Sequence, residues 1–238
     1  MLENDVKVAD KSFLSALQLG ERRYEVRRLE PDSLGDVITL QEYVLDHLTD
    51  KDLFLGRPHH ILAQCLGECG VAVGAYFAGE LIAFRMIYYP GECNQGEYAG
   101  LPVAVWEHVA HVEVEAVHPQ HRGNALQRRL AAPLLAAAGD LRGKRYLCSV
   151  VSPQNYPSIK DKLLLGLPVV RLLELPGNHW RYIFCRDRWN PAAFDSAAAV
   201  VVAAGDRQRQ QELLAQGYQG FQIQKSGDTS VIRFGVPR

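Results

Sequence analysis

The sequence lacks a large net charge of either sign, because 26 Lys and Arg residues nearly balance 27 Asp and Glu residues and leave a formal charge of −1. Proteins that bind nucleic acid favour a basic surface, so we expect no nucleic-acid partner. The sequence also lacks an apolar run of the roughly 20 residues that a membrane span needs. Residues 1–11 are charged and contain no apolar core of the kind found in signal peptides. The sequence therefore predicts a cytoplasmic protein without a membrane partner.

The sequence lacks the even cysteine count of a disulfide framework. The chain of 238 residues has five cysteines. Disulfide frameworks belong to small secreted proteins with even counts, so reduced thiols are expected here. Cys65 and Cys69 are four residues apart and would share a helical stripe, but no His or second Cys pair nearby completes a set of four ligands. We therefore expect no metal site.

What the sequence does contain is a regular alternation of strand and helix patterns. Their order predicts an α/β (α+β) fold, with a mixed, mostly antiparallel central sheet flanked by helices. Three parts are expected: a helical segment over 1–21, a main domain over 22–190, and an extension over 191–238 that packs on the main domain. Helices are expected at 12–19, 34–48, 58–66, 126–138, 156–165 and 207–214. Strands are expected at 24–29, 71–77, 80–89, 108–117, 146–151, 169–175, 180–186, 197–203, 219–225 and 230–234.

The most informative segment is Val117-His118-Pro119-Gln120-His121-Arg122-Gly123-Asn124-Ala125-Leu126. It joins an expected strand to an expected helix through a basic loop with Gly123 at its centre. Such a loop directs several backbone N–H groups at one point, where the helix dipole adds partial positive charge, and it would hold a diphosphate. The alternative is an ordinary strand-to-helix turn that contains Gly for backbone reasons only.

Two motifs at the expected spacing resemble those of the GNAT N-acyltransferases. Gln120 to Ala125 is similar to the family's Q/R-x-x-G-x-G/A signature. A second block resembles its N-x-x-(A/S)-(I/L)…L-G-F segment, with Leu167 in place of the usual Phe. Asn155, Ser158, Ile159, Leu165 and Gly166 fall in register without a gap. The resemblance covers roughly residues 24–188 and implies the GNAT fold.

The resemblance implies acetyl-CoA, or another acyl-CoA, as a cosubstrate. The pyrophosphate would lie on the backbone N–H groups of residues 122–125, and the backbone of 115–117 would pair with the pantetheine amides like an added strand. Asn155 would lie beside the pantetheine, and the alternative for this residue is an N-cap of the helix that it precedes. The expected cofactor-binding residues are Glu115, Ala116, Val117, Gln120, His121, Arg122, Gly123, Asn124, Ala125 and Asn155.

The implied reaction is direct attack by a primary amine on the thioester, which requires a group that takes the amine's proton. Strand alternation places Val112, Val114 and Ala116 on one face of the strand. The other face, which would line a wet cleft, holds His111, Glu113, Glu115 and Val117. His111 is the first candidate base because it titrates nearest neutrality, and Glu113 is the second. The alternative is a polar face that only binds substrate or pairs with a neighbouring strand.

One position departs from the family pattern. Many members carry a Tyr four residues before the Gly of the second block, where it protonates the leaving thiolate, and this chain has Lys162 there. Lys162 is expected to be an exposed helix residue, with proton donation as the alternative. The missing Tyr supports a second hypothesis, a catalytically silent acyl-CoA-binding sensor or scaffold. The partner of an active enzyme would be a small-molecule amine or a protein amine, and the sequence is compatible with a homodimer.

Overall fold

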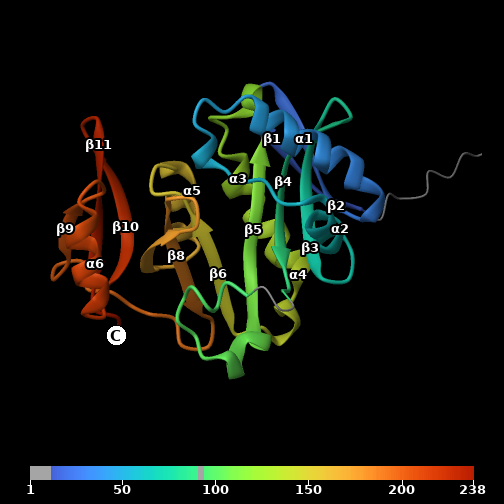
Figure 1. Ribbon diagram of the computed structural model, residues 1–238. Helices are drawn as coiled ribbons and strands as arrows, with labels where there is room; N and C mark the ends of the chain where they lie inside the picture. Colours follow the sequence, from blue (N-terminus) through green and yellow to red (C-terminus); the bar gives the residue numbers. More distant parts are fainter. Residues whose placement is uncertain (1–11, 91–93) are drawn as a thin grey trace, which may run out of the picture.

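The computed structural model describes residues 12–90 and 94–238. Within these residues eleven strands form one sheet, in the order β1-β2-β3-β4-β5-β6-β8-β7-β10-β11-β9 (Figure 1). The strands are β1 (Phe13–Leu19), β2 (Arg22–Leu29), β3 (Gly70–Phe77), β4 (Glu80–Tyr88), β5 (Val109–Val117), β6 (Tyr146–Val151), β7 (Val169–Leu175), β8 (His179–Asp187), β9 (Val200–Ala203), β10 (Gln219–Ser226) and β11 (Thr229–Gly235). The helices are α1 (Leu34–Asp46), α2 (His59–Leu66), α3 (Leu126–Arg129), α4 (Ala131–Ala138), α5 (Tyr156–Leu164) and α6 (Arg207–Ala215).

The sheet is mixed and mostly antiparallel, which confirms the expected fold class. Among the described strands the parallel pair is β5 with β6, and the neighbouring pairs run antiparallel. The chain crosses from β5 to β6 through α3 and α4, as a parallel connection requires. The site described below lies at this junction.

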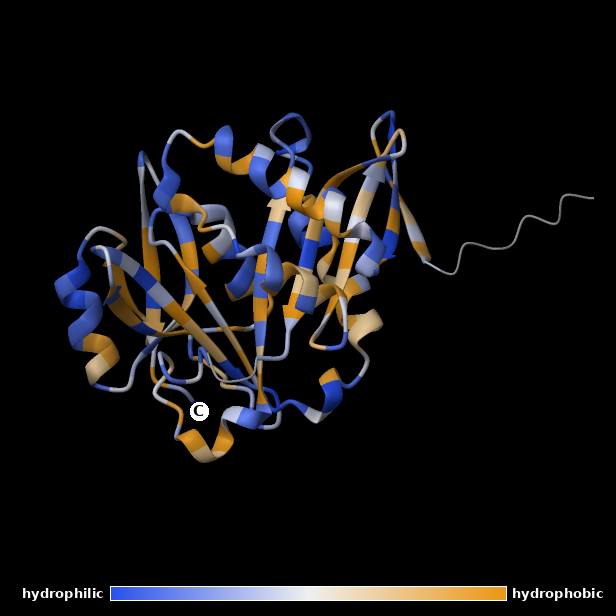
Figure 2. Cartoon of the chain, turned by 45° about the vertical axis from the view of Figure 1, so that its right-hand side comes forward, coloured by the Kyte–Doolittle hydropathy of each residue, from blue (hydrophilic) through white to orange (hydrophobic). Residues whose placement is uncertain are grey.

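Helices cover both faces of the sheet, and each face has its own apolar core. On one face, α1 and α2 contribute Val37, Leu40 and Leu62 to a cluster that includes Phe84 and Met86 of β4. On the other face, α3, α4 and α5 pack over the second cluster with residues such as Leu126, Leu134 and Ile159. Figure 2 shows the resulting mixture of apolar and polar residues along the central strands, and the mostly hydrophilic residues of α6 at the edge of the molecule.

The N-terminal helix expected at residues 12–19 is wrong, because Phe13–Leu19 form strand β1. This segment pairs antiparallel with β2, from Leu19↔Arg22 to Phe13↔Arg27. Gly20, at φ +60°, supplies the left-handed conformation that closes so short a connection. Local helical periodicity is here overridden by pairing with a neighbouring strand. Residues 1–11 of the expected helical segment lie outside the described residues.

The single helix expected at 126–138 is two helices, α3 and α4, which meet at Leu130. Pro133 explains the division, because it has no N–H to donate to the carbonyl of Arg129 four residues earlier. Leu130 itself keeps right-handed dihedral angles, φ −75° and ψ −11°. Its N–H donates to Leu126 O at 2.9 Å, so the two helices follow each other with little interruption.

The C-terminal extension continues the same sheet. β10 meets β7 at one backbone pair, Gly220↔Val169, and β11 and β9 follow outward. A buried hydrogen bond of 2.6 Å from the Tyr182 hydroxyl to Gln210 Oε1 joins β8 to α6. In the described part of the chain, no helix is long and apolar enough to cross a membrane.

Candidate acyl-CoA site

The site is built around the point where β5 and β6 separate. The two strands pair from Val109↔Tyr146 to His111↔Cys148, and Ser149 Oγ then donates to Val112 O at 3.0 Å. Beyond Val112 no backbone pair joins them among the described residues, and Figure 1 shows them diverging toward the end of β5. The outer half of β5 is thus held by β4 on one side, through pairs such as Arg85↔Glu115, and has a free backbone edge on the other.

An extra residue in β5 reverses which face its side chains occupy. β4 and β5 pair at Arg85↔Glu115 and next at Ile87↔Val112, so Glu113 and Val114 together lie opposite Met86. Two residues facing one define a β-bulge, and a shift of one residue moves all later side chains to the other face. The expected single polar face of β5 is therefore wrong. Val114 packs with the cluster beneath α1 and α2, whereas Val112 belongs to the cluster beneath α3 to α5.

The loop after β5 presents a row of unpartnered backbone donors. It follows the 3-10 helix Pro119–His121 and leads into α3. Within the described residues, the backbone N–H groups from Gly123 to Arg128 donate to no acceptor, and the next one, that of Arg129, donates to Ala125 O at 2.9 Å. Six consecutive free N–H groups at the start of a helical segment fit a phosphate or diphosphate, as the sequence predicts.

Two residues of this loop have left-handed backbone conformations. Gly123 lies at φ +82°, and a Cβ added there would meet no heavy atom within 4 Å. The position therefore opens outward, where a ligand can approach the backbone, and glycine adopts it without strain. Ala125, at φ +54° and ψ +28°, adopts the same region at some cost in strain.

The side chains of the loop divide into those that hold it and those that remain exposed. His121 is 8% exposed and faces inward, with Nδ1 at 3.1 Å from the Tyr24 hydroxyl. Burial, with the nearby Arg22 and His118, lowers the pKa of His121, so this side chain is neutral at pH 7. Arg22 also donates to Gln120 O at 3.2 Å. Arg122 is exposed beside the free N–H groups. His121 and Gln120 thus shape the loop, and Arg122 is available to an anion.

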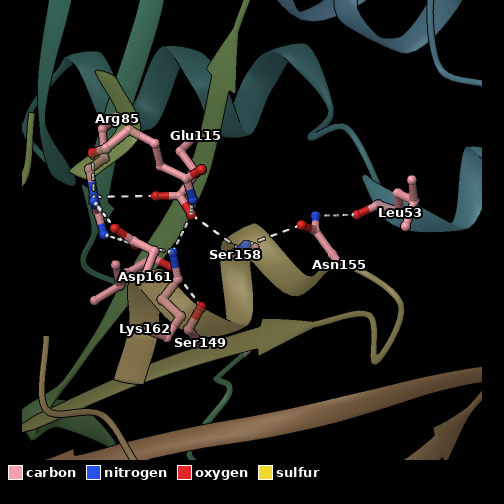
Figure 3. A network of polar contacts seen from close by, with 10 residues as sticks. Leu53, Arg85, Glu115, Ser149, Asn155, Ser158, Asp161 and Lys162 are labelled. Carbon is pink, nitrogen blue, oxygen red and sulfur yellow. Dashed lines mark hydrogen bonds and ion pairs between the residues drawn. The ribbon is translucent and has the colours of Figure 1, made fainter. Parts of the chain in front are cut away.

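Asn155 caps α5, so its structural role is shown directly. Its Oδ1 accepts from Ser158 N at 3.1 Å, and its Nδ2 donates to Leu53 O at 2.9 Å (Figure 3). The second bond ties the start of α5 to the 3-10 helix Lys51–Leu53. With both of its polar atoms engaged, Asn155 positions this end of α5, and its contact with a cofactor stays a prediction.

A buried ionic cluster fills the space between β4, β5 and α5 (Figure 3). Arg85, with its side chain 1% exposed, donates two hydrogen bonds to Asp161, at 3.1 and 2.6 Å. Lys162 pairs with Glu115 and lies 3.3 Å from Asp161. Burial favours a higher pKa for Asp161, but the positive charges of Lys162 and Arg85 outweigh it and hold this pKa below its usual value. Two cations and two anions therefore balance in this cluster.

The expectation that Lys162 is an exposed helix residue is wrong, because it is 2% exposed. A buried ammonium needs a carboxylate partner, and Glu115 provides it from β5. Glu115 reaches α5 because the bulge turns it to that face of the sheet. Glu115 Oε1 also accepts from Ser158 Oγ at 3.3 Å and from Gln127. Lys162 is thus held beside the free edge of β5, at the position where the resembled family has its Tyr.

The two candidate bases form a second cluster on the opposite face. His111 and Glu113 are 2% and 7% exposed, and His111 Nδ1 lies 3.1 Å from Glu113 Oε1. Gln95 N donates to His111 Nε2 at 2.9 Å, so the imidazole proton belongs on Nδ1 and is donated to Glu113. Arg57 Nε and Gln95 Nε2 also donate to this carboxylate, at 2.6 and 2.8 Å. The wet cleft expected here is therefore a closed hydrogen-bonded cluster.

The charge states of this pair follow from their surroundings. Burial lowers the pKa of His111 and outweighs the opposing effect of Glu113, so the imidazole is neutral. Burial acts to raise the pKa of Glu113, but hydrogen bonds and charge from His111 and Arg57 hold it below its usual value. Glu113 is consequently the ionised member. His111 has its one lone pair directed at Gln95 N and therefore needs that N–H to move before it can accept a proton.

Sequence reasoning missed Arg57, Gln95, Arg85 and Asp161. The buried ion pair of Arg85 could have been predicted. Arg85 interrupts the apolar segment Leu81-Ile82-Ala83-Phe84-Arg85-Met86, and a charge in such a strand needs a buried partner. Arg57 and Gln95 come from loops, and no pattern in the sequence connects them with β5. Only the folded chain shows that they meet Glu113.

Asp52 links the loop beside Asn155 to β8, and it gives a pH prediction. A hydrogen bond from Arg181 lowers the pKa of Asp52, and burial acts in the opposite direction. With a further hydrogen bond from His179, the pKa falls from 3.8 to about 2. A lowered folded-state pKa stabilises the protein above the unfolded value, and that stability is lost as the pH falls toward 2. The free energy of unfolding of wild type should therefore exceed that of Asp52→Asn at neutral pH.

The difference between these two proteins should narrow between pH 4 and pH 2, as read from denaturant unfolding at a series of pH values. Asp187 also has a pKa lowered to about 2, by Arg145, and it remains in both proteins, so only the difference reports on Asp52. A difference that stays constant over this pH range would contradict the assigned ion pairs.

The chain is similar to known proteins in its fold, and sequence comparison finds no match. No family model and no curated sequence matches it. Among solved structures, the GNAT domain of S. lividans PAT is 19% identical with a TM-score of 0.51, covering 73% of this chain and 96% of that one. An N-acetyltransferase from Staphylococcus aureus Mu50 is 13% identical with a TM-score of 0.53, covering 69% and 98%. Salmonella typhimurium yncA, solved with its cofactor acetyl-CoA, is 16% identical with a TM-score of 0.52, covering 73% and 98%.

These likenesses concern architecture, since all three identities lie below 20%. They agree with the central sheet flanked by helices described above. In the residues that the structure describes, no group of three or more His, Cys, Asp or Glu side chains is arranged to hold a metal. The architecture that the two sequence motifs imply is thus the one observed: the chain has the GNAT fold.

Proposed function

We propose that the protein is an acyl-CoA-dependent N-acyltransferase that moves an acetyl group from acetyl-CoA to a primary amine by direct attack. The observation that carries this proposal is the row of six free N–H groups from Gly123 to Arg128, at the end of the strand whose outer edge is unpaired. The loop suits the pyrophosphate, and the edge of residues 113–117 suits the amides of the pantetheine arm, which would add to β5 as a short strand.

Acetyl-CoA supplies an activated thioester, and the protein supplies the proton transfers. On one face of β5, the ionised Glu113 is the acceptor for the proton of an incoming ammonium, directly or through a water molecule, with His111 orienting its Oε1. On the other face, Lys162 carries protons close to the free edge of β5 and is the candidate donor to the departing thiolate. The bulge at Glu113 and Val114 makes this division between faces.

The direct test of binding is thermal unfolding with CoA, acetyl-CoA and longer acyl-CoAs. A ligand at about 100 times its dissociation constant should stabilise the protein by about 2.7 kcal/mol. Turnover is then followed as free thiol released with a panel of amines, including small amines and peptides that carry Lys or a free N-terminus. If no CoA compound raises the unfolding temperature, the proposal is wrong.

Replacing the acidic group should separate catalysis from binding. Glu113→Gln should lower kcat about 10²-fold or more, because general-base catalysis contributes about that factor, while CoA affinity changes little. His111→Ala should have a smaller effect of the same kind. Glu107→Gln is the matched control, since its side chain is 78% exposed, and it should leave both quantities unchanged. Unchanged kcat in both site variants would assign the proton transfer to another group.

A second candidate function is a catalytically silent acyl-CoA-binding module. The observation in its favour is that the Glu113 carboxylate already accepts from Arg57, Gln95 and His111, while Lys162 is engaged by Glu115. Such a module would be stabilised by acyl-CoA in the thermal assay and would release no thiol with any amine. The two readouts of the preceding test therefore separate the two functions.

A further inference from the structure

Cys148 and Cys185 face each other on neighbouring strands. They are direct partners in the antiparallel register of β6 and β8. The Cys148 thiol donates a hydrogen bond to Cys185 Sγ, with the two sulfur atoms 3.5 Å apart. The proposed acyl transfer uses neither thiol. The pair therefore calls for a separate chemical account.

The backbone places this pair in the geometry that a disulfide needs. Cys185 N donates to Pro168 O at 3.2 Å, so the polar backbone groups of Cys185 point toward β7 and away from β6. Cys148 and Cys185 are therefore a non-hydrogen-bonded pair of β6 and β8, in which Cα atoms are about 4.5 Å apart and side chains are closest. Disulfides bridge Cα separations of about 4.4–6.8 Å, so a bond forms here without moving either strand far.

The two thiols differ in their access to solvent. Cys148 is fully buried, whereas Cys185 is partly exposed and lines a cavity of about 230 Å³. The same cavity is bordered by Arg186, Asp187 and Arg238, and so has a polar wall. The hydrogen bond to Cys185, together with burial, raises the pKa of Cys148, which keeps this residue as the neutral thiol. Cys185 is thus the sulfur that a small reagent reaches first.

We propose that Cys148 and Cys185 are an oxidative modification site, at which a peroxide converts the two thiols into an intramolecular disulfide. Cys185 attacks the peroxide as a thiolate, and the O–O bond breaks to leave a sulfenic acid on Cys185 and hydroxide. The sulfur of Cys148 then attacks Cys185 Sγ, loses its proton and displaces the sulfenic oxygen as water. Two thiols are oxidised, and one peroxide is reduced to two water molecules.

This modification site adjoins the first candidate base. Cys148 is also the parallel partner of His111, so the side chains of His111, Cys148 and Cys185 lie in one row across three neighbouring strands. The bond would shorten the distance between the sulfur atoms from 3.5 Å to about 2.05 Å. It would also close a loop of chain between β6 and β8, which restricts the unfolded state and raises the unfolding temperature.

The test treats the full-length protein with hydrogen peroxide, blocks the remaining thiols, and maps tryptic peptides. Residues 146–160 and 182–186 form two tryptic peptides, each with a single cysteine. The expected result is a cross-link between them that dithiothreitol reverses, in a monomer with a raised unfolding temperature. Cys185→Ser should abolish the cross-link, and Cys69→Ser, which removes another exposed thiol, should leave it intact.

Three outcomes would overturn the proposal. They are a cross-link that joins other cysteines, a cross-link between two molecules, and Cys185 oxidised to sulfinic acid while Cys148 stays reduced. Mapping of the wild-type protein decides between these results even if a variant fails to fold. None of the outcomes depends on acyl-CoA binding, so the proposed function and the disulfide stand or fall separately.

Discussion

Gly123→Glu should abolish the stabilisation by CoA and acetyl-CoA that we expect of the wild-type protein in thermal unfolding. The substitution places a side chain where the Gly123 Cβ position faces open space, at the first residue of the row of free N–H groups. It adds a negative charge where phosphates would lie, and it strains a backbone at φ +82°. We expect loss of detectable binding by thermal shift and by calorimetric titration.

Gly143→Glu is the matched control for this experiment. Gly143 also has a positive φ, +69°, and a Cβ there would also meet no atom within 4 Å. The variant therefore carries the same charge change and a similar backbone strain, but it lies in the turn before β6, away from the loop. It should bind CoA like wild type. Equal binding by Gly123→Glu and Gly143→Glu would refute the proposed phosphate site.

Arg85→Met lowers the free energy of unfolding by about 3–5 kcal/mol, as expected when one member of a buried ion pair is removed. Arg85 is fully buried and bonds Asp161 through both Nη atoms. Without it, two carboxylates share the single ammonium of Lys162, and one buried charge has no compensation. Urea unfolding at neutral pH gives the free energy and the midpoint.

Two further variants identify the cause of that loss. Arg209→Met removes an exposed ion pair with Glu212 on α6 and should have no measurable effect. Adding Asp161→Leu to Arg85→Met restores the charge balance, because Lys162 and Glu115 remain as a pair, and should recover part of the lost stability. A double variant less stable than Arg85→Met would show that packing, rather than charge, dominates at this position.

The sequence predicted the parts of this protein whose structure depends on neighbours along the chain. The loop around Gly123 can be predicted because its motif, its turn and the ends of its flanking elements all lie within about ten residues. The order of strands and helices followed from local periodicity, apart from the first strand. Phe13–Leu19 fit either periodicity, and pairing with β2 decided the outcome.

What could not be predicted depends on residues that meet only in the folded chain. The bulge in β5 is set by the register with β4, and the residue types of Glu113 and Val114 do not predict it. With the strand's phase misplaced by one residue, Glu115 was assigned to the wrong face, and Lys162 consequently had no visible partner. One backbone irregularity thus accounts for the errors at Glu115 and Lys162, whereas the closed cluster around Glu113 depends on Arg57 and Gln95.

The joint between β7 and β10 has a mechanical consequence. The outer strands meet the rest of the sheet through one backbone pair, while side chains such as Leu213 and Ile223 share the large core cluster. A force that pulls β9, β10, β11 and α6 away from β7 would therefore be opposed by few backbone hydrogen bonds. Apolar packing would provide most of the resistance. Separation of the C-terminal unit would therefore expose apolar side chains before it broke many backbone hydrogen bonds.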